Sequence, residues 1–249
     1  MLNRYLDFQS AVGITKHTGG PGATRELLAM CGVDQATAVL EVGCGIGVGP
    51  ANLARAHDCR VVGVDRSDQM IEWSRRRARE HGVADRVELL VADATSLPFE
   101  DGAFDIAIAE SVLAFVDDKP KALREMVRVV RAGGHVGINE SIWTGELPPD
   151  VAKLARDLDV EVESAVTWTS LCEQAGLHDL VVRLRRIDAG VEVRNRLRWV
   201  GLPWAVRAWG RTIALYATQP EVRHDVQAFY GSGLAVFDYV GYGLFVGTV

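Results

Sequence analysis

The sequence has few cysteines, and their spacing matches neither a disulfide framework nor a zinc site. The 249 residues include four cysteines, which are Cys31, Cys44, Cys59 and Cys172. None of them forms a C-x-x-C pair, and no two histidines share one helix face at the spacing of metal ligands. We therefore expect reduced, mostly buried thiols and no bound metal.

Long apolar runs and an excess of positive charge are also missing. No run of 18 apolar residues is present, so no membrane span is expected. The first ten residues, MLNRYLDFQS, carry charges where a signal peptide is apolar, which favours a cytoplasmic protein. The 33 acidic residues outnumber the 27 basic ones, which argues against a general nucleic-acid binder.

The composition, with 48% hydrophobic and 24% charged residues, is ordinary for one large folded domain. Short apolar runs alternate with stretches of helical length, which predicts a parallel sheet covered by helices on both faces. The expected strands are 38–42, 60–64, 87–91, 104–109, 135–139, 180–187 and 240–249. The expected helices are 24–32, 49–57, 67–82, 118–131, 150–158 and 169–175. Residues 18–22 are expected to form a loop, and Gly133-Gly134 to end a helix.

A glycine-rich turn after the first strand is the strongest chemical signal. Residues 39–47 read VLEVGCGIG, and a helix follows them. Glycines let the backbone approach a ligand, and the helix N-terminus offers free N–H groups. The second strand ends at Asp65, where a carboxylate can accept hydrogen bonds from ribose hydroxyls.

Three interpretations fit this pattern: a site for S-adenosylmethionine, a site for NAD, and a tight turn that binds no ligand. A dinucleotide site prefers G-x-G-x-x-G, but Val48 stands at the last position. Glu41, two residues before the first glycine, is awkward for a pyrophosphate and suits an ammonium or sulfonium group. The turn therefore favours S-adenosylmethionine over NAD.

Three further segments extend the pattern, and with them the sequence resembles the class I S-adenosylmethionine-dependent methyltransferases. It is most similar to the branch that includes ubiquinone/menaquinone C-methyltransferases and many small-molecule methyltransferases. The matching segments are LEVGCGIG (40–47), VVGVDRSDQMI (61–71), DATSLPFEDGAFD (93–105) and ALREMVRVVRAGG (122–134). The resemblance implies a Rossmann-like, seven-stranded, mostly parallel sheet with an antiparallel last strand.

The resemblance also implies cofactor contacts, residue by residue. Around the methionine moiety it places Glu41, Gly43, Gly45 and Glu110 (or its neighbour Ser111), and at the ribose Asp65. At the adenine it places Arg66, Met70, Asp93 and Ala94. The product would be S-adenosylhomocysteine. Alanine at position 132, where the family often has proline, is expected to affect only a loop.

Residues at the carboxyl ends of strands and in the N-terminal segment are the candidates for catalysis and substrate contact. The candidate bases are Glu140 and His17, each with an ordinary surface or core role as the alternative. Substrate contacts are expected from Glu110, Glu140, Trp143, Trp199, Trp204 and His224. Tyr5 belongs to the same N-terminal segment, which we expect to close over the cofactor.

A basic, tryptophan-rich segment separates the last two expected strands. Residues 191–217 hold five Arg and one Glu, a net +4, and three of the six tryptophans. We expect a helical cap over the substrate, with or without dimerisation, and the alternatives are plain packing and contact with an anionic membrane. The predicted parts are an N-terminal lid (1–24), a core (25–188), a helical insertion (189–236) and a last strand (237–249).

The predicted function is methyl transfer to a small, hydrophobic or aromatic molecule by a monomer or homodimer. Oxygen, nitrogen and carbon acceptors all stay open. The alternatives are an NAD-dependent oxidoreductase and a non-catalytic S-adenosylmethionine-binding protein.

Overall fold

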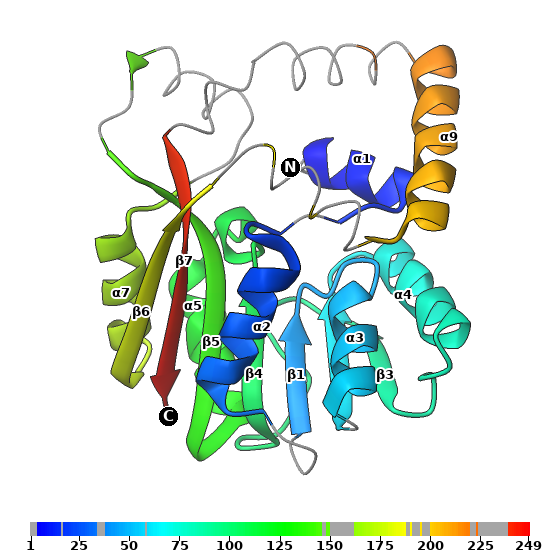
Figure 1. Cartoon of the computed structure of the whole chain (residues 1–249). Coiled ribbons are helices and arrows are strands. Elements are labelled where there is room, and N and C mark those ends of the chain that lie inside the picture. Colours follow the sequence, from blue (N-terminus) through cyan, green and yellow to red (C-terminus); the bar gives the residue numbers. More distant parts are fainter. Residues whose placement is uncertain are drawn as a thin grey trace.

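A computed structural model describes residues 4–15, 17–33, 38–57, 59–145, 148–149, 162–187, 190, 195, 200–219, 223 and 239–249. Figure 1 shows a central sheet with helices packed around it. The described strands form one seven-stranded sheet in the order β3-β2-β1-β4-β5-β7-β6. They are β1 (Ala38–Val42), β2 (Arg60–Asp65), β3 (Val87–Val91), β4 (Phe104–Glu110), β5 (Val130–Trp143), β6 (His178–Arg186) and β7 (Val240–Thr248).

The strand directions confirm the predicted mostly parallel sheet with an antiparallel last strand. β1 pairs in parallel with both β2 and β4, while β7 runs antiparallel between β5 and β6. The chain order reverses between β1 and β4, so the carboxyl ends of these two strands flank a topological switch point. Open α/β sheets place their ligands at such a point.

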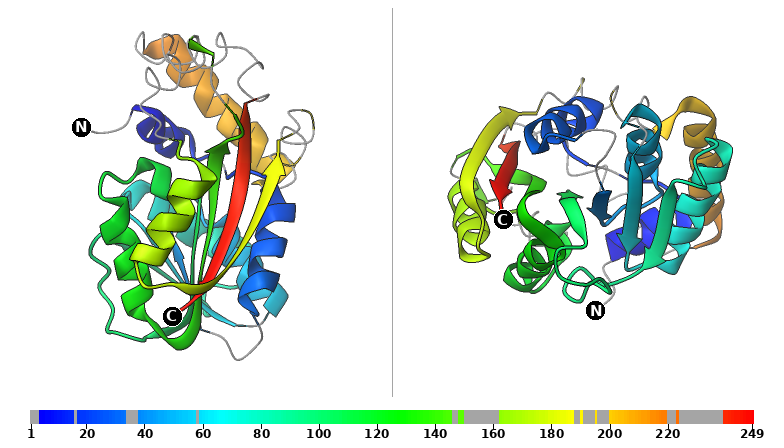
Figure 2. Two further views of the ribbon diagram at one scale, coloured as in Figure 1. Left: turned by 90° about the vertical axis from the view of Figure 1, so that its left-hand side faces the viewer. Right: turned by 90° about the horizontal axis from the view of Figure 1, so that it is seen from below.

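Helices cover both faces of the sheet, as the right-hand view in Figure 2 shows. The helices are α1 (Arg4–Val12), α2 (Gly20–Cys31), α3 (Val48–His57), α4 (Asp68–Glu80), α5 (Lys119–Val129), α7 (Ala165–Gln174), α9 (Leu202–Thr218) and the short 3-10 helix η1 (Leu113–Phe115). Leu40 of β1 faces the α5–α7 layer, and Val39 faces the layer of α2, α3 and α4. This alternation explains why the strands are apolar on both faces.

Local capping sets several of the helix starts. Ser67 accepts a hydrogen bond from Met70 N at the start of α4 (3.2 Å), and Asp118 accepts one from Lys121 N at the start of α5 (2.9 Å). Ser164 accepts one from Thr167 N, so α7 begins four residues before the predicted helix 169–175. Ser and Asp caps satisfy N–H groups that a helix leaves unpaired.

Two local predictions near glycines were wrong. Residues 20–22 do not form a loop, because α2 begins at Gly20 and carries Pro21 in its first turn, where proline is tolerated. The predicted lid boundary at residue 24 therefore falls inside α2. Gly133-Gly134 does not end a helix either, because α5 ends at Val129 and β5 begins at Val130. Gly133 N donates to Val249 O and Gly134 O accepts from Val249 N, so contacts with the residue after β7 hold these glycines in β5, where Gly133 has a φ of 74°.

Helices α1 and α9 lie beyond the carboxyl-terminal edge of the parallel strands (Figure 1). α9 belongs to the segment between β6 and β7, where the sequence predicted a helical insertion. The predicted helix 150–158 lies outside the described residues. None of the described helices is long and apolar enough to cross a membrane.

Candidate functional site

The turn between β1 and α3 has positive backbone φ angles, which glycine adopts more readily than any other residue. Gly43, Gly45 and Gly47 have φ angles of 72°, 53° and 74°. A Cβ on Gly45 would also lie 2.7 Å from Thr15 Oγ1, in the segment after α1. The turn therefore brings its backbone close to the N-terminal segment and leaves no room for larger residues.

Glu41, near the end of β1, is a buried carboxylate beside the first turn of α3. A Cβ on Gly49 would collide with both carboxylate oxygens of Glu41, so this position needs glycine. Burial raises the pKa of Glu41 well above its usual value, and the charge of Glu110 adds to the rise. A cation bound beside Glu41 would lower the pKa of this carboxyl again, because an opposite charge nearby favours the charged form.

Asp65, at the end of β2, lies against the glycine turn. Its Oδ2 accepts a hydrogen bond from Gly45 N and its Oδ1 one from Ser67 N, both at 2.9 Å. Burial raises the pKa of Asp65, and these two hydrogen bonds and the charge of Arg66 oppose the rise. Each carboxylate oxygen keeps a further lone pair, so the side chain can still accept hydrogen bonds from a diol.

The other residues expected at the adenine lie just after β2 and β3 and in the first turn of α4. Arg66 is exposed, and Met70 is buried in α4 among Ile46, Val48 and Trp204. Asp93, just after β3, is exposed, and the hydroxyl and backbone N–H of Thr95 lower its pKa. Ala94 is half-buried beside it. The packing of Met70 accounts for its burial without a ligand, whereas Asp93 presents an ionised acceptor at the sheet edge.

Glu110, at the end of β4, is the centre of a buried polar network. Thr24 Oγ1 donates to Glu110 Oε1 and Oε2 at 3.0 and 3.1 Å, and Asn139 Nδ2 donates to Oε2 at 3.0 Å. His17 Nε2 lies 3.1 Å from Thr24 Oγ1 and 3.9 Å from Glu110 Oε2. The network joins His17, expected from the sequence, to a strand end expected at the cofactor.

A second set of hydrogen bonds fastens the N-terminal segment across the strand ends. Thr18 N and Oγ1 each lie 3.1 Å from Ser111 Oγ, and Thr18 Oγ1 lies 2.8 Å from Ser141 Oγ. Asn139 Nδ2 also donates to Thr18 O at 2.9 Å. Ser111 has a positive φ of 55°, rare for a residue other than glycine, which the tight turn after β4 imposes.

Sequence reasoning missed Thr18, Thr24, Asn139 and Ser141. Asn139 carried a sequence signal, because it is a polar residue directly after the apolar Ile138, and the structure shows that it is fully buried in β5. Such a residue requires hydrogen-bond partners. The partners, however, come from segments more than 28 residues away, and a single sequence does not identify them.

Glu140 follows Asn139 in β5 and is also fully buried. Its Oε1 accepts hydrogen bonds from Val112 N (2.9 Å) and Leu113 N (2.8 Å) at the start of η1. Its Oε2 has no hydrogen-bond partner among the residues that the structure describes. Burial raises the pKa of Glu140 to about 7, against these backbone hydrogen bonds and the charge of Lys119. Glu140 thus holds the turn after β4, with no exposed surface toward a ligand.

The aromatic residues expected at the substrate are found in different settings. Trp143 is half-buried at the end of β5. Trp204, in α9, is 5% exposed, donates to Gly13 O at 2.6 Å and meets the Trp73 ring edge-on at 5.6 Å. The guanidinium of Arg77 lies 4.1 Å from the centre of the Trp204 ring. These contacts favour a packing role for Trp204. Trp199 and His224 lie outside the described residues.

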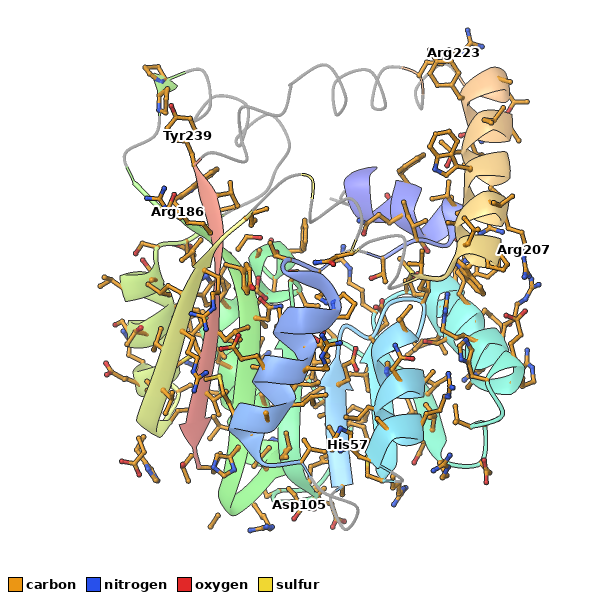
Figure 3. All side chains as sticks on the ribbon, in the orientation of Figure 1. His57, Asp105, Arg186, Arg207, Arg223 and Tyr239 are labelled. Carbon is orange, nitrogen blue, oxygen red and sulfur yellow. The ribbon has the colours of Figure 1, made fainter. Side chains whose placement is uncertain are left out.

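The side chains labelled in Figure 3 include residues at both ends of the strands. Asp105 lies at the edge opposite the glycine turn, where it accepts from Ala38 N (2.8 Å) and Arg131 Nε (2.6 Å). These two hydrogen bonds give Asp105 a structural role. Arg207 of α9 points away from the sheet (Figure 3), and its Nη1 lies 3.6 Å from Glu80 Oε1 of α4. Within the described part of the chain, no group of three His, Cys, Asp or Glu is arranged to hold a metal.

Comparison with known proteins adds a family match over the central part of the chain. Residues 40–138 match the model of a family described as "Methyltransferase domain". A phosphoethanolamine N-methyltransferase of Triticum aestivum is 30% identical over 182 residues, which are 72% of this chain and 35% of the relative. Methyltransferase GfsG of Streptomyces halstedii is 35% identical over 168 residues, which are 64% of this chain and 59% of the relative.

The chain therefore spans less than two thirds of the length of these curated relatives. A solved structure has the same fold over nearly its whole length. It is an S-adenosylmethionine-dependent methyltransferase from Geobacter sulfurreducens in complex with S-adenosyl-L-homocysteine. The TM-score is 0.72 at 22% identity, and the match covers 99% of this chain and 98% of the other. The narrower resemblance to quinone C-methyltransferases stays a prediction.

Proposed function

Because this chain belongs to the class I S-adenosylmethionine-dependent methyltransferases, we propose that it moves a methyl group from S-adenosylmethionine to a small, hydrophobic or aromatic molecule. One observation carries the proposal: Glu41 and Glu110 are two buried carboxylates close enough for one to raise the pKa of the other. They lie beside a glycine turn at the switch point of the sheet. Such a site suits a ligand with a cationic group and a nucleoside.

The residues fit this cofactor at both ends. Glu41 and Glu110 receive the ammonium group of the methionine moiety, whose charge offsets their repulsion. Gly43 and Gly45 let the backbone approach it. Asp65 accepts from the ribose hydroxyls while Gly45 N and Ser67 N hold its carboxylate in place. At the adenine we place Asp93, Ala94, Arg66 and Met70, with Asp93 accepting from the amino group and Met70 packing against the ring.

When bound, the cofactor supplies an electrophilic methyl on a sulfonium, and the remaining work is alignment of the acceptor and exclusion of water. The buried His17-Thr18 segment, tied to Ser111, Asn139 and Ser141, closes over the strand ends and excludes water from them. An acceptor that arrives protonated also needs a base. Product release then requires this segment to open.

We assign the base to His17 and not to Glu140. The pKa of about 7 would suit Glu140 to proton transfer, but its side chain is completely buried and its Oε1 is used by the turn after β4. His17 lies on the N-terminal segment itself, and its ring reaches Glu110 through Thr24. Glu140 then acts by shaping the β4–η1 turn, which presents Glu110 and Ser111.

The insertion supplies the cap over the acceptor. α9 is held to α1 and α4 through Trp204 and through Arg211, whose Nε donates to Val12 O at 2.7 Å. It therefore lies beside α1 and beyond α4 (Figure 1). We keep Trp143, Trp199 and His224 as substrate contacts. A cytoplasmic location, the absence of nucleic-acid binding and a monomeric or homodimeric state stay predictions from the sequence.

The test is calorimetry of the purified protein with S-adenosylmethionine, S-adenosylhomocysteine and NAD. We expect binding of the first two, and tight NAD binding without them would overturn the proposal. Asp65→Ala should weaken S-adenosylhomocysteine binding by about 1–3 kcal/mol, because a charged hydrogen-bond acceptor is lost. Asp105→Ala is the matched control, since it removes a strand-end carboxylate at the opposite edge and should leave this affinity unchanged.

Turnover is tested separately. The protein is incubated with S-adenosylmethionine and a panel of small hydroxy, amino and aromatic acceptors, and S-adenosylhomocysteine is measured. Release of S-adenosylhomocysteine only in the presence of an acceptor supports an enzyme. Tight binding of both cofactor forms without turnover across the panel would favour the non-catalytic binding protein.

A further inference from the structure

Thr24, near the start of α2, is the one residue that hydrogen-bonds both His17 and Glu110 among the described residues. Its Oγ1 lies 3.1 Å from His17 Nε2, and 3.0 and 3.1 Å from the two oxygens of Glu110. All three side chains are at most 9% exposed. The His17 ring is itself 3.9 Å from Glu110 Oε2, beyond hydrogen-bond range, so Thr24 is the link between them.

The single proton of the Thr24 hydroxyl determines the direction of these hydrogen bonds. A carboxylate is an acceptor only, and Glu110 Oε2 already accepts from Asn139 Nδ2. The Thr24 proton is therefore directed to Glu110. Its oxygen is then left to accept from His17, which requires a proton on Nε2. In a neutral imidazole with a proton on Nε2, the lone pair is on Nδ1.

We propose that Thr24 is a positioning residue that fixes the tautomer of His17, so that Nδ1 is the basic nitrogen of this site. The inference deepens the proposed function, because it rests on His17 as the base for a protonated acceptor. Nδ1 takes the proton of the acceptor O–H or N–H as the acceptor forms its bond to the methyl carbon. The carbon–sulfur bond breaks, and its electron pair stays on sulfur.

The same chain of hydrogen bonds stabilises the charge that results. After proton transfer the His17 ring is an imidazolium that still donates from Nε2 to Thr24, and Thr24 still donates to the Glu110 carboxylate. The negative charge of Glu110 thus acts on the imidazolium through one hydroxyl. Asn139 keeps Glu110 in place and, through Thr18 O, keeps the His17 segment closed. An orienting group behind a histidine base is a recurrent arrangement in catalysis.

The test is nitrogen NMR of the full chain with labelled histidine, recorded at mildly alkaline pH. His17→Gln identifies the His17 signals among those of the six histidines. We expect a protonated Nε2 and an unprotonated Nδ1, with the Nε2 proton protected from exchange with water. An unprotonated Nε2 in the wild-type protein would overturn the proposal without any variant.

Three variants separate positioning from packing. Thr24→Val keeps the side-chain shape and removes the hydroxyl, so the Nε2 proton should exchange at least about tenfold faster, as expected when one hydrogen bond is lost. Thr24→Ser should restore its protection. Thr169→Val is the matched control, because the Thr169 hydroxyl bonds only within α7, to Ala165 O at 2.9 Å, among the described contacts. Unchanged protection in Thr24→Val would refute the link.

Calorimetry with S-adenosylhomocysteine on the same samples keeps the two proposals apart. Loss of Nε2 protection with retained binding supports the Thr24 assignment. A wild-type protein that shows the expected tautomer but binds no S-adenosylhomocysteine would contradict the proposed function and leave the hydrogen-bond assignment standing.

Discussion

Glu140→Gln replaces a fully buried carboxylate by a neutral group of the same shape, and its effect on stability should depend strongly on pH. Burial raises the folded-state pKa of Glu140 from 4.5 to about 7. The folded protein therefore binds this proton more tightly than the unfolded chain does. The stabilisation is fully present below about pH 4.5 and is lost as the pH rises through about 7.

The size of the effect follows from the shift. The rise from 4.5 to about 7 in the pKa of Glu140, at about 1.4 kcal/mol per pH unit, corresponds to roughly 3.5 kcal/mol. The free energy of unfolding of the wild type should lose this contribution between about pH 4.5 and pH 8, and Glu140→Gln should not. The amide oxygen can still accept from Val112 N and Leu113 N, so the turn after β4 keeps its hydrogen bonds.

Urea denaturation of both proteins between pH 5 and pH 8 measures the difference. Relative to the wild type, the variant should become more stable by up to about 3 kcal/mol across this range. Other buried carboxylates such as Glu41 are present in both proteins, so their contributions cancel. Two curves that run parallel over the whole range would refute the reasoning.

Glu125→Gln is the matched control for this experiment. The hydrogen bond from Arg128 lowers the pKa of Glu125, so its contribution to stability is present above its unfolded-state pKa and is lost as the pH falls below it. Its removal should therefore produce no relative gain in stability between pH 5 and pH 8. A gain in this control would mean that the glutamate-to-glutamine change itself, and not burial, causes the effect.

Two further predictions concern packing around the site. Trp204→Ala should destabilise the docking of α9 by about 3–5 kcal/mol and speed hydrogen exchange in that helix, because it removes a buried ring held by Trp73, Arg77 and Gly13. Trp209→Ala in the same helix, at a side chain 69% exposed, should change stability by less than about 0.5 kcal/mol, and equal effects would contradict the packing role. Gly49→Ala should weaken S-adenosylhomocysteine binding in calorimetry at least about tenfold, because the added methyl displaces the Glu41 carboxylate and its charged hydrogen bond to the ligand. Gly210→Ala, where a Cβ meets nothing within 4 Å, should leave binding unchanged and stabilise α9 by up to about 1 kcal/mol, and a loss of affinity there would indicate an indirect effect.

Much of the fold could be predicted from the sequence because the signals are local. The apolar runs of β1 to β4 and the amphipathic stretches of α3, α4 and α5 matched the observed elements within a few residues. Ser67 and Asp118 mark helix starts through caps that form within four residues. The glycine turn and Asp65 were also found, because the family resemblance is contained in short continuous segments.

The structure differs most from the sequence-based expectations where distant contacts override local preference. Gly133-Gly134 is a typical helix end in isolation, but pairing with Val249 keeps it in β5. Trp204 was expected at the substrate, yet Gly13 and Trp73, far away in the chain, form a packing site for it. Glu140 had the right residue type for a base, and only the fold revealed that its carboxylate is fully buried under the β4–η1 turn.

By itself the sequence determined the α/β class, the order of the strands along the chain and the glycine turn after β1, since periodicity and short motifs encode them. The tertiary structure alone decided which polar groups meet. The buried network spans more than 120 residues of the sequence and joins His17, Thr24, Glu110 and Asn139. The sequence around each of these residues does not identify its hydrogen-bond partners. A buried polar group must find its hydrogen bonds across the fold, and this requirement makes the candidate base and its support a property of the folded chain.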